Sequence, residues 1–469
     1  MNYESTRGES PRLGFDDVLL TGLAPDGGLY IPEHWPQFSA KEIARLPGLP
    51  YAELAARVMG PFVAGSAVEA EFDAVVAEAY SEFEHAAVVP LKQLEPSLWL
   101  MEQFHGPTLA FKDLALQLLG RLFDRVLKAR GERVTVVGAT SGDTGSAAIE
   151  ACRDREQIDI FILHPKGRVS EVQRRQMTTV DARNVHNIAI EGSFDDCQDL
   201  VKAMFNDAAF RREMRLSAVN SINWARIMAL IAYYFAAAVA LGAPQRAVEV
   251  AVPTGNFGNV YAAYAARRMG LPIDGFVVGS NRNDILTRFF ESGTMQIAEV
   301  EPSYSPSMDI QVSSNFERLL FDLFEGDGEQ VKHTLTQFRK TGRFEVAANS
   351  LRQALALFAG HRLDDPETLA EIRRIHAETG ELVDPHTAVG IAAARSRRGA
   401  AETPMIALAT AHPAKFPDAV EEATGIRPAL PERLADLFEK PERMESLSND
   451  LDAVQAHIRA AVSEALPAG

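Results

Sequence analysis

Six short apolar segments, separated by helical sequence, constrain the fold more than any other feature of this chain. They lack a clear alternation of apolar and polar residues, and most are followed by a turn rich in Gly, Ser, Asn or Thr. Such segments are typical of parallel strands covered by helices on both faces. The segments are RVTVVGA (133–139), DIFILHP (159–165), NVHNIAIEG (184–192), VEVAVPTG (248–255), DGFVVGS (274–280) and PMIALAT (404–410). We therefore predict a doubly wound α/β protein, with one or two such sheets.

The length of the chain predicts more than one domain. A chain of 469 residues exceeds what one hydrophobic core usually supports, so two or three domains are expected. The first 95 or so residues differ in sequence pattern from the alternating strands and helices that follow, because they contain a turn-rich stretch at 26–36 and then amphipathic helices. They are expected to form a separate domain. The apolar stretch 227–241 is shorter than the roughly 20 residues that span a bilayer, so it is predicted to be a buried helix.

Charge and cysteine content exclude several classes of protein. The net charge of −17 argues against a protein that binds nucleic acid or anionic membranes, and it means that an anionic substrate needs a local cationic pocket. The two cysteines, Cys152 and Cys197, make neither a disulfide framework nor a metal-ligand pattern. The N-terminal residues contain no apolar core of a signal peptide. We expect a soluble, reduced, cytoplasmic protein without a metal.

Three loops at predicted strand ends could bind a ligand, because open α/β sheets bind ligands at the carboxyl ends of their strands. GATSGDTGSAAIEA (138–151) supplies glycines and hydroxyls, although an ordinary strand–helix turn explains it equally well. PTGNFGNVYAAYAA (253–266) places two glycines and two asparagines at a helix start, where main-chain N–H groups suit a phosphate. In ALATAHPAKFPDAV (407–420), Thr410 ends a strand; by itself this loop is better explained as a structural turn.

Lys112 lies in an apolar setting, TLAFKDLALQ (108–117), where a turn meets a helix. Alone, such a lysine usually extends its charged end to water. A lysine, a phosphate-binding loop and a hydroxyl at another strand end are, however, the three attachments that pyridoxal phosphate needs. They supply an imine at C4′, a seat for the phosphate and a partner for the ring nitrogen. Asp113 could either cap the following helix or tune the lysine.

The chain resembles the threonine synthases, pyridoxal-phosphate enzymes of fold type II with the tryptophan-synthase-β fold. The blocks that carry the resemblance are STRG, DGGLY, GPTLAFKD, TSGDTGSAA, SFDDCQ, NSINWARI, PTGNFGN, SSNFERLL and TAHPAKF. Their order is that of the branch with an extra N-terminal domain. The resemblance implies two open, mostly parallel sheets and a mostly helical N-terminal domain. The implied boundaries are 1–95 for that domain, 96–425 for the catalytic region with a smaller sheet at roughly 130–225, and 426–469 for a helical tail.

The resemblance also implies roles for individual residues. Lys112 would be the catalytic lysine that bonds the cofactor, Thr410 would meet the pyridine nitrogen, and Asp143 would lie beside the phenolic oxygen, where dehydratases usually have Asn. The cofactor phosphate would be held by Gly255, Asn256, Phe257, Gly258 and Asn259. The substrate carboxylate would be received by Thr140, Ser141, Gly142, Asp143 and Thr144. For the substrate phosphate, the basic cluster at 164–176 offers Lys166 and Arg168 and the NSINWARI block offers Asn220, with Arg7 as a further possibility. A solvated helix face explains most of the arginines in that cluster equally well.

The implied reaction converts O-phospho-L-homoserine and water into L-threonine and phosphate. The amine of Lys112 would act as the base at Cα and shuttle protons at Cβ, phosphate would leave from Cγ, and water would add at Cβ. A neutral hydroxyl at Thr410 would leave the pyridine nitrogen largely unprotonated, which restrains transamination. The expected partner is the small-molecule substrate alone, with a monomer or a homodimer left open.

Three other functions fit parts of the sequence. A serine or threonine dehydratase, or a β-replacement synthase, would share the lysine and the glycine loop, but not the N-terminal module or the TSGDTG and NSINWAR blocks. A non-catalytic relative that binds phosphorylated metabolites would not need Lys112, GNFGN and Thr410 together. A nucleotide kinase would need the Lys-Ser/Thr of a Walker loop, which is missing after Gly142.

Overall fold

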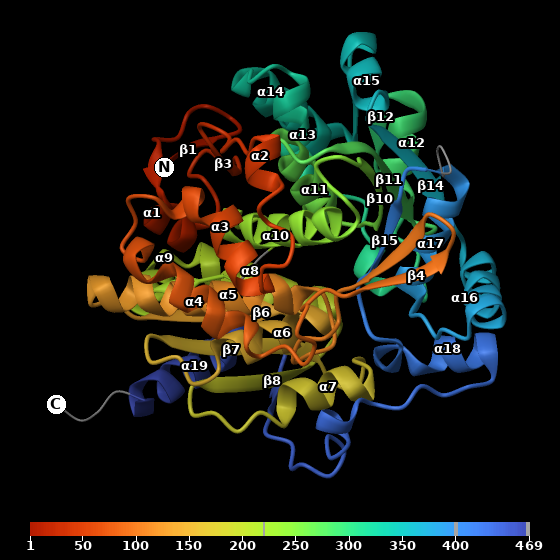
Figure 1. The fold of residues 1–469 in the computed structure, drawn as a ribbon. Coiled ribbons are helices and arrows are strands. Elements are labelled where there is room, and N and C mark those ends of the chain that lie inside the picture. Colours follow the sequence, from red (N-terminus) through yellow and green to blue (C-terminus); the bar gives the residue numbers. More distant parts are fainter. Residues whose placement is uncertain (219–220, 398–401, 466–469) are drawn as a thin grey trace. The chain divides into compact units, whose positions relative to one another are not determined.

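The computed structural model describes residues 1–218, 221–397 and 402–465, and the chain divides into two compact units (Figure 1). The first unit comprises Met1–Phe111 and Ser221–Ala429, and the second comprises Lys112–Asn220 and Leu430–Gly469. Each unit is built around its own open sheet. Lys112 is the first residue of the second unit.

The first unit contains a six-stranded sheet in the order β14-β11-β10-β15-β5-β4. The strands are β4 (Leu91–Glu95), β5 (Leu98–Glu102), β10 (Val248–Pro253), β11 (Ile273–Ser280), β14 (Phe358–Arg362) and β15 (Met405–Ala409). All neighbours are parallel except β4 and β5. Because Ala251 of β10 pairs with Ala407 of β15, the loops that follow these two strands leave the same edge of the sheet.

Helices cover this sheet and bury its apolar side chains. Helix α17 (Pro385–Arg397) contacts β10, β11, β14 and β15, and its Ala388 and Ile391 share a core with Leu98 and Ala251. Helices α11 (Gly258–Arg268) and α12 (Ile285–Ser292) pack on the same sheet, α11 against β10 and β11 and α12 against β11 and β14. The other strands and α-helices of the first unit after residue 293 are β12 (Thr294–Gln296), α13 (Phe316–Leu323), α14 (Gly328–Thr341), β13 (Arg343–Glu345), α15 (Ala348–Leu355), α16 (Asp365–Thr379) and α18 (Pro417–Thr424).

The N-terminal residues belong to the first unit and pack on helix α10 (Trp224–Ala240) through α3 (Tyr51–Val63). They form an antiparallel sheet of β1 (Asn2–Ser5), β2 (Leu13–Gly14) and β3 (Tyr30–Pro32), with α1 (Phe15–Thr21), α2 (Ala40–Ile43) and α4 (Phe72–Tyr80). The centroid of the Trp224 ring lies 5.9 Å from the ring centroid of Tyr3 and 5.5 Å from that of Phe62. The predicted buried helix at 227–241 is confirmed up to Ala240, the last residue of α10, and nearly all of these residues are buried.

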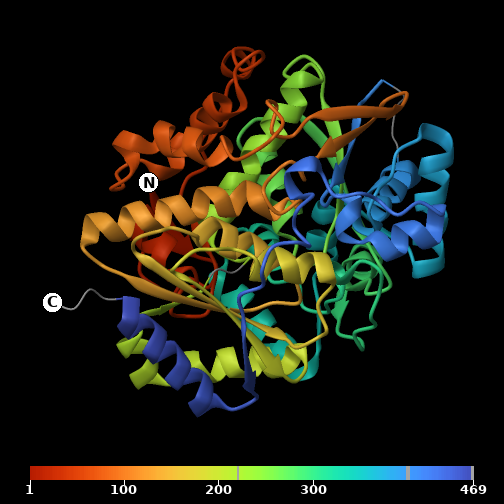
Figure 2. The same ribbon diagram turned by 90° about the horizontal axis from the view of Figure 1, so that it is seen from below.

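The second unit contains an all-parallel sheet in the order β16-β8-β7-β6-β9. Its strands are β6 (Val134–Ala139), β7 (Ile158–Pro165), β8 (Val185–Glu191), β9 (Leu216–Ser217) and β16 (Glu445–Ser448). Figure 2 shows α5 (Lys112–Arg130) and α6 (Asp143–Cys152) on one face, and α8 (Phe194–Asn206) and α19 (Leu451–Ala465) on the other. Leu163 and Ile188 of the sheet share a core with Leu200 and Val454 of the latter two helices. The remaining helices are α7 (Glu171–Thr178) and α9 (Ala208–Glu213).

All six strands predicted from the sequence are present, as β6, β7, β8, β10, β11 and β15. The C-terminal segment contains the helix α19, but also β16, a strand that the sequence did not predict and that extends the smaller sheet beside β8. In the part of the chain that the structure describes, no helix combines the length and the apolarity needed to cross a bilayer.

A buried ion pair joins the N-terminal STRG block to α13. The guanidinium of Arg7 donates to both carboxylate oxygens of Glu317, with both nitrogen–oxygen distances 3.0 Å, and the Thr6 hydroxyl donates to the same carboxylate at 2.7 Å. The Arg7 and Glu317 side chains are only 6% and 8% exposed. The Nε and Nη2 groups of Arg7, which could otherwise bind an anionic ligand, are thus both bound to a protein carboxylate.

We predict that Glu317→Gln destabilises the first unit, because it leaves the buried Arg7 guanidinium without its counter-charge. Loss of one partner of a buried pair typically costs about 3 to 5 kcal/mol in the free energy of unfolding. Urea unfolding followed by tryptophan fluorescence measures this effect, since Trp35, Trp99 and Trp224 all lie in the first unit.

The matched control is Glu53→Gln, which breaks an exposed pair with Arg57 on α3; both side chains are 48% exposed. An exposed pair contributes about 0.2 to 1 kcal/mol, so this variant should unfold close to the wild type. Equal unfolding midpoints for the two variants would contradict a stabilising role for the Arg7–Glu317 pair.

Candidate active site

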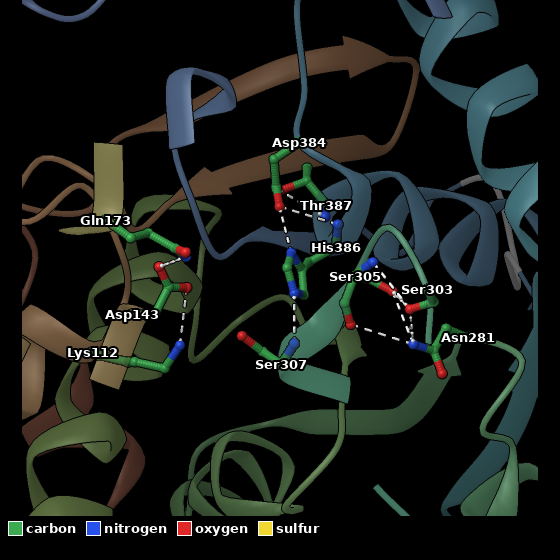
Figure 3. Close-up of polar contacts among 10 residues, drawn as sticks. All are labelled: Lys112, Asp143, Gln173, Asn281, Ser303, Ser305, Ser307, Asp384, His386 and Thr387. Carbon is green, nitrogen blue, oxygen red and sulfur yellow. Dashed lines mark hydrogen bonds and ion pairs between the residues drawn. The ribbon is translucent and has the colours of Figure 1, made fainter. Parts of the chain in front are cut away.

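Lys112 begins helix α5, and its side chain is buried against a carboxylate. Its Nζ donates to Oδ2 of Asp143, the first residue of α6, at 3.1 Å (Figure 3). The side chains of Lys112 and Asp143 are 8% and 7% exposed. An acidic group at a helix start is stabilised by the helix dipole. The lysine therefore does not extend to water, and its amine has a fixed position inside the second unit.

Gln173 of α7 orients the carboxylate of Asp143. Its Nε2 donates to Oδ1 of Asp143 at 2.8 Å, and its Oε1 accepts from the Ser170 hydroxyl at 2.9 Å. The first contact settles the direction of the amide, because a flipped amide would place oxygen against carboxylate oxygen. The Gln173 amide fits here only because residue 142 is a glycine, since a Cβ at Gly142 would lie 2.3 Å from Oε1 of Gln173.

The loop before α6 is organised by Thr140. Its buried hydroxyl accepts from the N–H groups of Gly142 at 3.0 Å and Gly145 at 2.9 Å. Gly142 adopts φ 149°, which other residues avoid. Ser141 is exposed and Thr144 is half-buried. Thr140 thus shapes the loop from inside, while Ser141 and Thr144 lie nearer to the surface.

The loop Gly255–Asn259 presents main-chain N–H groups. The carbonyl of Gly255 accepts from the Ser313 hydroxyl at 2.7 Å, and that of Asn256 accepts from Nδ2 of Asn315 at 3.0 Å. Among the described residues, none accepts a hydrogen bond from the main-chain N–H groups of this loop, and no side chain caps α11. A helix start of this kind is a ready anion site.

The side-chain oxygen of Asn259 contacts two tyrosines of α10. Tyr234 donates to its Oδ1 at 2.7 Å and to its carbonyl at 2.9 Å, and Tyr233 also contacts Oδ1. Asn259 can therefore serve an anion through its main-chain N–H.

Thr410 follows β15 at the sheet edge that also carries the Gly255–Asn259 loop. The residue is 6% exposed, and its hydroxyl has no hydrogen-bond partner among the described residues. Its carbonyl accepts from the N–H of Phe111 at 2.8 Å, directly before Lys112. The His412 side chain accepts from the N–H of Ala414, and Nζ of the buried Lys415 donates to the Thr108 carbonyl at 2.6 Å. The contacts of His412 and Lys415 thus stabilise the turn after β15.

A second polar network lies against the Gly255–Asn259 loop. The buried Asp384 accepts from Nδ1 of His386 at 2.7 Å, which leaves Nε2 to accept from the N–H of Ser307 at 3.3 Å (Figure 3). The Ser307 carbonyl lies 2.9 Å from the position of a Cβ at Gly255. Only a glycine at 255 permits this close approach.

The residues expected at the substrate phosphate are placed differently from one another. Lys166 and Arg168 lie on the exposed turn after β7, where Nζ of Lys166 pairs with Glu191 at 3.3 Å and the Lys166 side chain is 52% exposed. The neighbouring Arg174 pairs with Glu442. Asn220 lies outside the described residues.

Sequence reasoning missed Gln173, His386, Ser313 and Asn315. For Gln173 a signal existed, since Ser170 and Gln173 have the S-x-x-Q spacing of a capping box, and Ser170 does cap α7. Ser313 and Asn315 lie in the SSNFERLL block, but nothing in their types indicates that they hold the carbonyls of a distant loop.

The groups found among the described residues fit pyridoxal phosphate. They are available N–H groups for the phosphate, a buried hydroxyl for the ring nitrogen and a buried lysine for the aldehyde. Comparison with known families agrees, because residues 84–337 match the family model "Pyridoxal-phosphate dependent enzyme". The chain is therefore a pyridoxal-phosphate enzyme with two open α/β sheets.

The flanking segments define the family more closely. Residues 2–80 match "Threonine synthase N terminus", and residues 387–458 match "Threonine synthase, C-terminal". The chain is 58% identical to the threonine synthase of Pseudomonas aeruginosa and 43% identical to that of Corynebacterium glutamicum, covering at least 98% of each chain. This chain belongs to the threonine synthase family.

Solved structures give the same result. A pyridoxal-phosphate-bound threonine synthase from Brucella melitensis superposes with a TM-score of 0.97 at 52% identity, covering 98% of this chain and 99% of that one. Yeast threonine synthase gives a TM-score of 0.94 at 38% identity, covering 99% of both chains.

We predict that Gln173→Glu disturbs the position of Lys112, because it replaces a donor by an acceptor facing the Asp143 carboxylate. A displacement of this kind typically costs about 10- to 100-fold in turnover. The measurements are kcat and the visible absorbance of the bound cofactor. Combining it with Asp143→Asn should restore much of the loss, since the new amide can donate to the carboxylate introduced at position 173 while its oxygen faces Lys112.

The control is Glu171→Gln, an exposed change on the same helix. The role of Gln173 as a donor is contradicted if the single Gln173→Glu variant keeps wild-type kcat and absorbance. It is equally contradicted if the double variant is no better than that single one.

Proposed function

We propose that this chain converts O-phospho-L-homoserine and water into L-threonine and phosphate with pyridoxal 5′-phosphate as cofactor. The observation that carries the proposal is the likeness to threonine synthases along the whole chain, combined with a buried lysine at the helix start of the GPTLAFKD block.

The proposed cofactor site uses Lys112 for the aldehyde, the main-chain N–H groups of Gly255–Asn259 for the phosphate and the Thr410 hydroxyl for the ring nitrogen. Asp143 would lie beside the phenolic oxygen. When bound, the cofactor supplies an electron sink for the bonds at the substrate's Cα. A neutral hydroxyl at the ring nitrogen moderates that sink, which disfavours transamination.

Lys112 is the proposed proton carrier. Its Nζ would remove the proton from Cα and move protons at Cβ, while phosphate leaves from Cγ and water adds at Cβ. Asp143, at 3.1 Å from Nζ, would hold the amine between these positions. Burial of both side chains supports this role, because proton transfer at a carbon requires a fixed amine shielded from bulk water.

The proposed substrate contacts follow the sequence prediction. The turn of Thr140, Ser141, Gly142 and Thr144 at the start of α6 would receive the amino-acid carboxylate. Lys166 and Arg168, with Asn220, would approach the substrate phosphate. We further propose a cytoplasmic monomer or homodimer that acts on this small molecule and binds neither nucleic acid nor membrane, in keeping with the net charge of −17.

We expect Lys112→Ala to lower threonine formation from O-phosphohomoserine by at least about 10²-fold, since one positioned acid–base group usually contributes that much. The variant should also lose the visible absorbance of the lysine-bound cofactor. The assay measures threonine and phosphate release, and L-threonine is supplied separately to detect dehydratase activity as ketobutyrate.

Lys128→Ala is the matched control, because Lys128 lies on the same helix α5 with its side chain 63% exposed. It should behave as the wild type. Turnover by Lys112→Ala near the wild-type rate would refute the assignment of Lys112. Ketobutyrate from threonine without phosphate release from O-phosphohomoserine would refute the synthase function.

A further inference from the structure

Residues 303–309, which we call the strap, lie against Gly255 at the start of the Gly255–Asn259 loop. A Cβ at Gly255 would lie 2.9 Å from the Ser307 carbonyl oxygen and 3.2 Å from Cα of Met308, so the two backbones are in direct contact. Any side chain at position 255 would force one of them to move. The position of the strap therefore limits the position of Gly255.

The direction of the N–H groups in the loop depends on the backbone at this point. The Ser313 hydroxyl donates to the Gly255 carbonyl at 2.7 Å, and the N–H of Asn315 donates to the Asn256 carbonyl at 3.1 Å. The carbonyl and N–H groups of a trans peptide point in opposite directions. The N–H groups of Asn256 and Phe257 consequently point away from these two donors. A shift of Gly255 would change the direction in which they point.

One histidine connects the strap to helix α17. Nε2 of His386 accepts from the N–H of Ser307 at 3.3 Å, and its Nδ1 donates to Oδ2 of Asp384 at 2.7 Å (Figure 3). A carboxylate only accepts hydrogen bonds, so the proton is on Nδ1 and the lone pair of Nε2 faces Ser307. His386 is 4% exposed and Asp384 is fully buried. The imidazole is thus held in one tautomer and one orientation.

Asp384 is in turn fixed by the start of α17. Its Oδ2 accepts from the N–H of His386 at 3.1 Å, and its Oδ1 accepts from the N–H of Thr387 at 3.0 Å and from the Thr387 hydroxyl. The helix packs on β10, β11 and β15, with Ala388 and Ile391 in the core. The core of the first unit therefore fixes Nε2 of His386, and this atom holds the middle of the strap.

The ends of the strap have an anchor of their own. Asp309 accepts from Nδ2 of Asn281, directly after β11, at 2.7 Å and from the Ser303 hydroxyl at 2.6 Å. These contacts close the strap on itself without involving His386. A change at His386 is thus expected to release the strap at Ser307, the residue that touches Gly255, and to leave its ends in place.

We propose that His386 is a positioning residue for the cofactor. Through Ser307 it holds the strap against Gly255, and it thereby keeps the N–H groups of the loop directed at the cofactor phosphate. This inference rests on the proposed function, in which the Gly255–Asn259 loop binds that phosphate. The imidazole is suited to the task because it carries a donor for the buried carboxylate at one nitrogen and an acceptor for the strap at the other.

Two substitutions separate the two contacts of the imidazole. In His386→Gln the amide reaches the position of Nε2, where its oxygen can accept from Ser307, but the donor to Asp384 is lost. In His386→Asn the amide takes the position of Nδ1 and can donate to Asp384, but the acceptor that Nε2 offers Ser307 is lost. A role confined to the start of α17 makes the glutamine the more damaging change, whereas the proposed role makes the asparagine so.

The test measures binding of pyridoxal 5′-phosphate, and of pyridoxal without the phosphate, to full-length apoenzyme prepared from the holoenzyme. Visible absorbance follows both. His386→Asn should weaken binding of pyridoxal 5′-phosphate about 10-fold, as expected for the loss of one buried hydrogen bond. It should leave pyridoxal binding unchanged, because only the phosphate contacts the loop. His386→Gln should bind both compounds as the wild type does.

Two further variants serve as references. Gly255→Ala tests the loop directly, because its Cβ would press on the Ser307 carbonyl. It should also lower the affinity for pyridoxal 5′-phosphate relative to pyridoxal. His333→Asn is the matched control, since His333 is an exposed histidine on α14. It should leave both affinities and the unfolding temperature unchanged.

The outcomes separate this inference from the proposals on which it rests. An unchanged affinity ratio in Gly255→Ala would refute the phosphate loop, and the role of His386 with it. A lowered ratio there, with an unchanged ratio in His386→Asn, would overturn the role of His386 alone. That role is equally overturned if glutamine costs more than asparagine, or if both variants unfold earlier and lose the two compounds equally. A wild-type enzyme that makes no threonine would refute the proposed reaction and leave the binding result intact.

Discussion

The hydrogen bonds that hold the carbonyls of the Gly255–Asn259 loop are the constraint on which the candidate site depends. Ser313 and Asn315 donate hydrogen bonds to the carbonyls of Gly255 and Asn256 and so fix the backbone of the loop. The N–H groups of the loop have no acceptor among the described residues and can bind a ligand. In a chain with a net charge of −17, main-chain N–H groups attract an anion without adding a cation that neighbouring carboxylates would neutralise. The direction of the backbone alone thus makes this helix start suitable for an anion, and it is here that we propose the cofactor phosphate to bind.

The buried charges of this protein fall into two kinds. Arg7 and Lys112 each face a carboxylate, Glu317 and Asp143 respectively, and Arg318 donates to carbonyl groups. Arg226 is 5% exposed, and its Nη1 has no such partner among the described residues. Since pairing offsets most of the cost of burying an ion, the charges of Arg7 and Arg318 are compensated within the fold. The burial of Arg226 carries a cost that no described residue offsets.

Much of the fold could be predicted because parallel strands carry a strong local signal. β7 and β10 are runs of apolar residues between turns, so their positions followed from composition and spacing. β16 carries no such signal: Glu445–Ser448 is mostly exposed, and it is a strand only because the edge of β8 offers it unpaired backbone groups. Likewise, Lys112 could be singled out only together with the GNFGN loop and Thr410, and the spacing of Ser170 and Gln173 indicated a helix cap but not the contact of Gln173 with Asp143. The role of Gln173 depends on this contact, which exists only once α6 and α7 are folded side by side.

The position of Lys112 shows how local and distant constraints combine at the site. Phe111, directly before it in the sequence, donates its N–H to the carbonyl of Thr410 at the end of β15. The side chain is then fixed by Asp143, which Gln173 orients. The amine is thus buried beside a carboxylate that is itself held in place. This arrangement supports the role of proton carrier that we propose for Lys112, because a group that transfers protons at a carbon has to be positioned before the reaction.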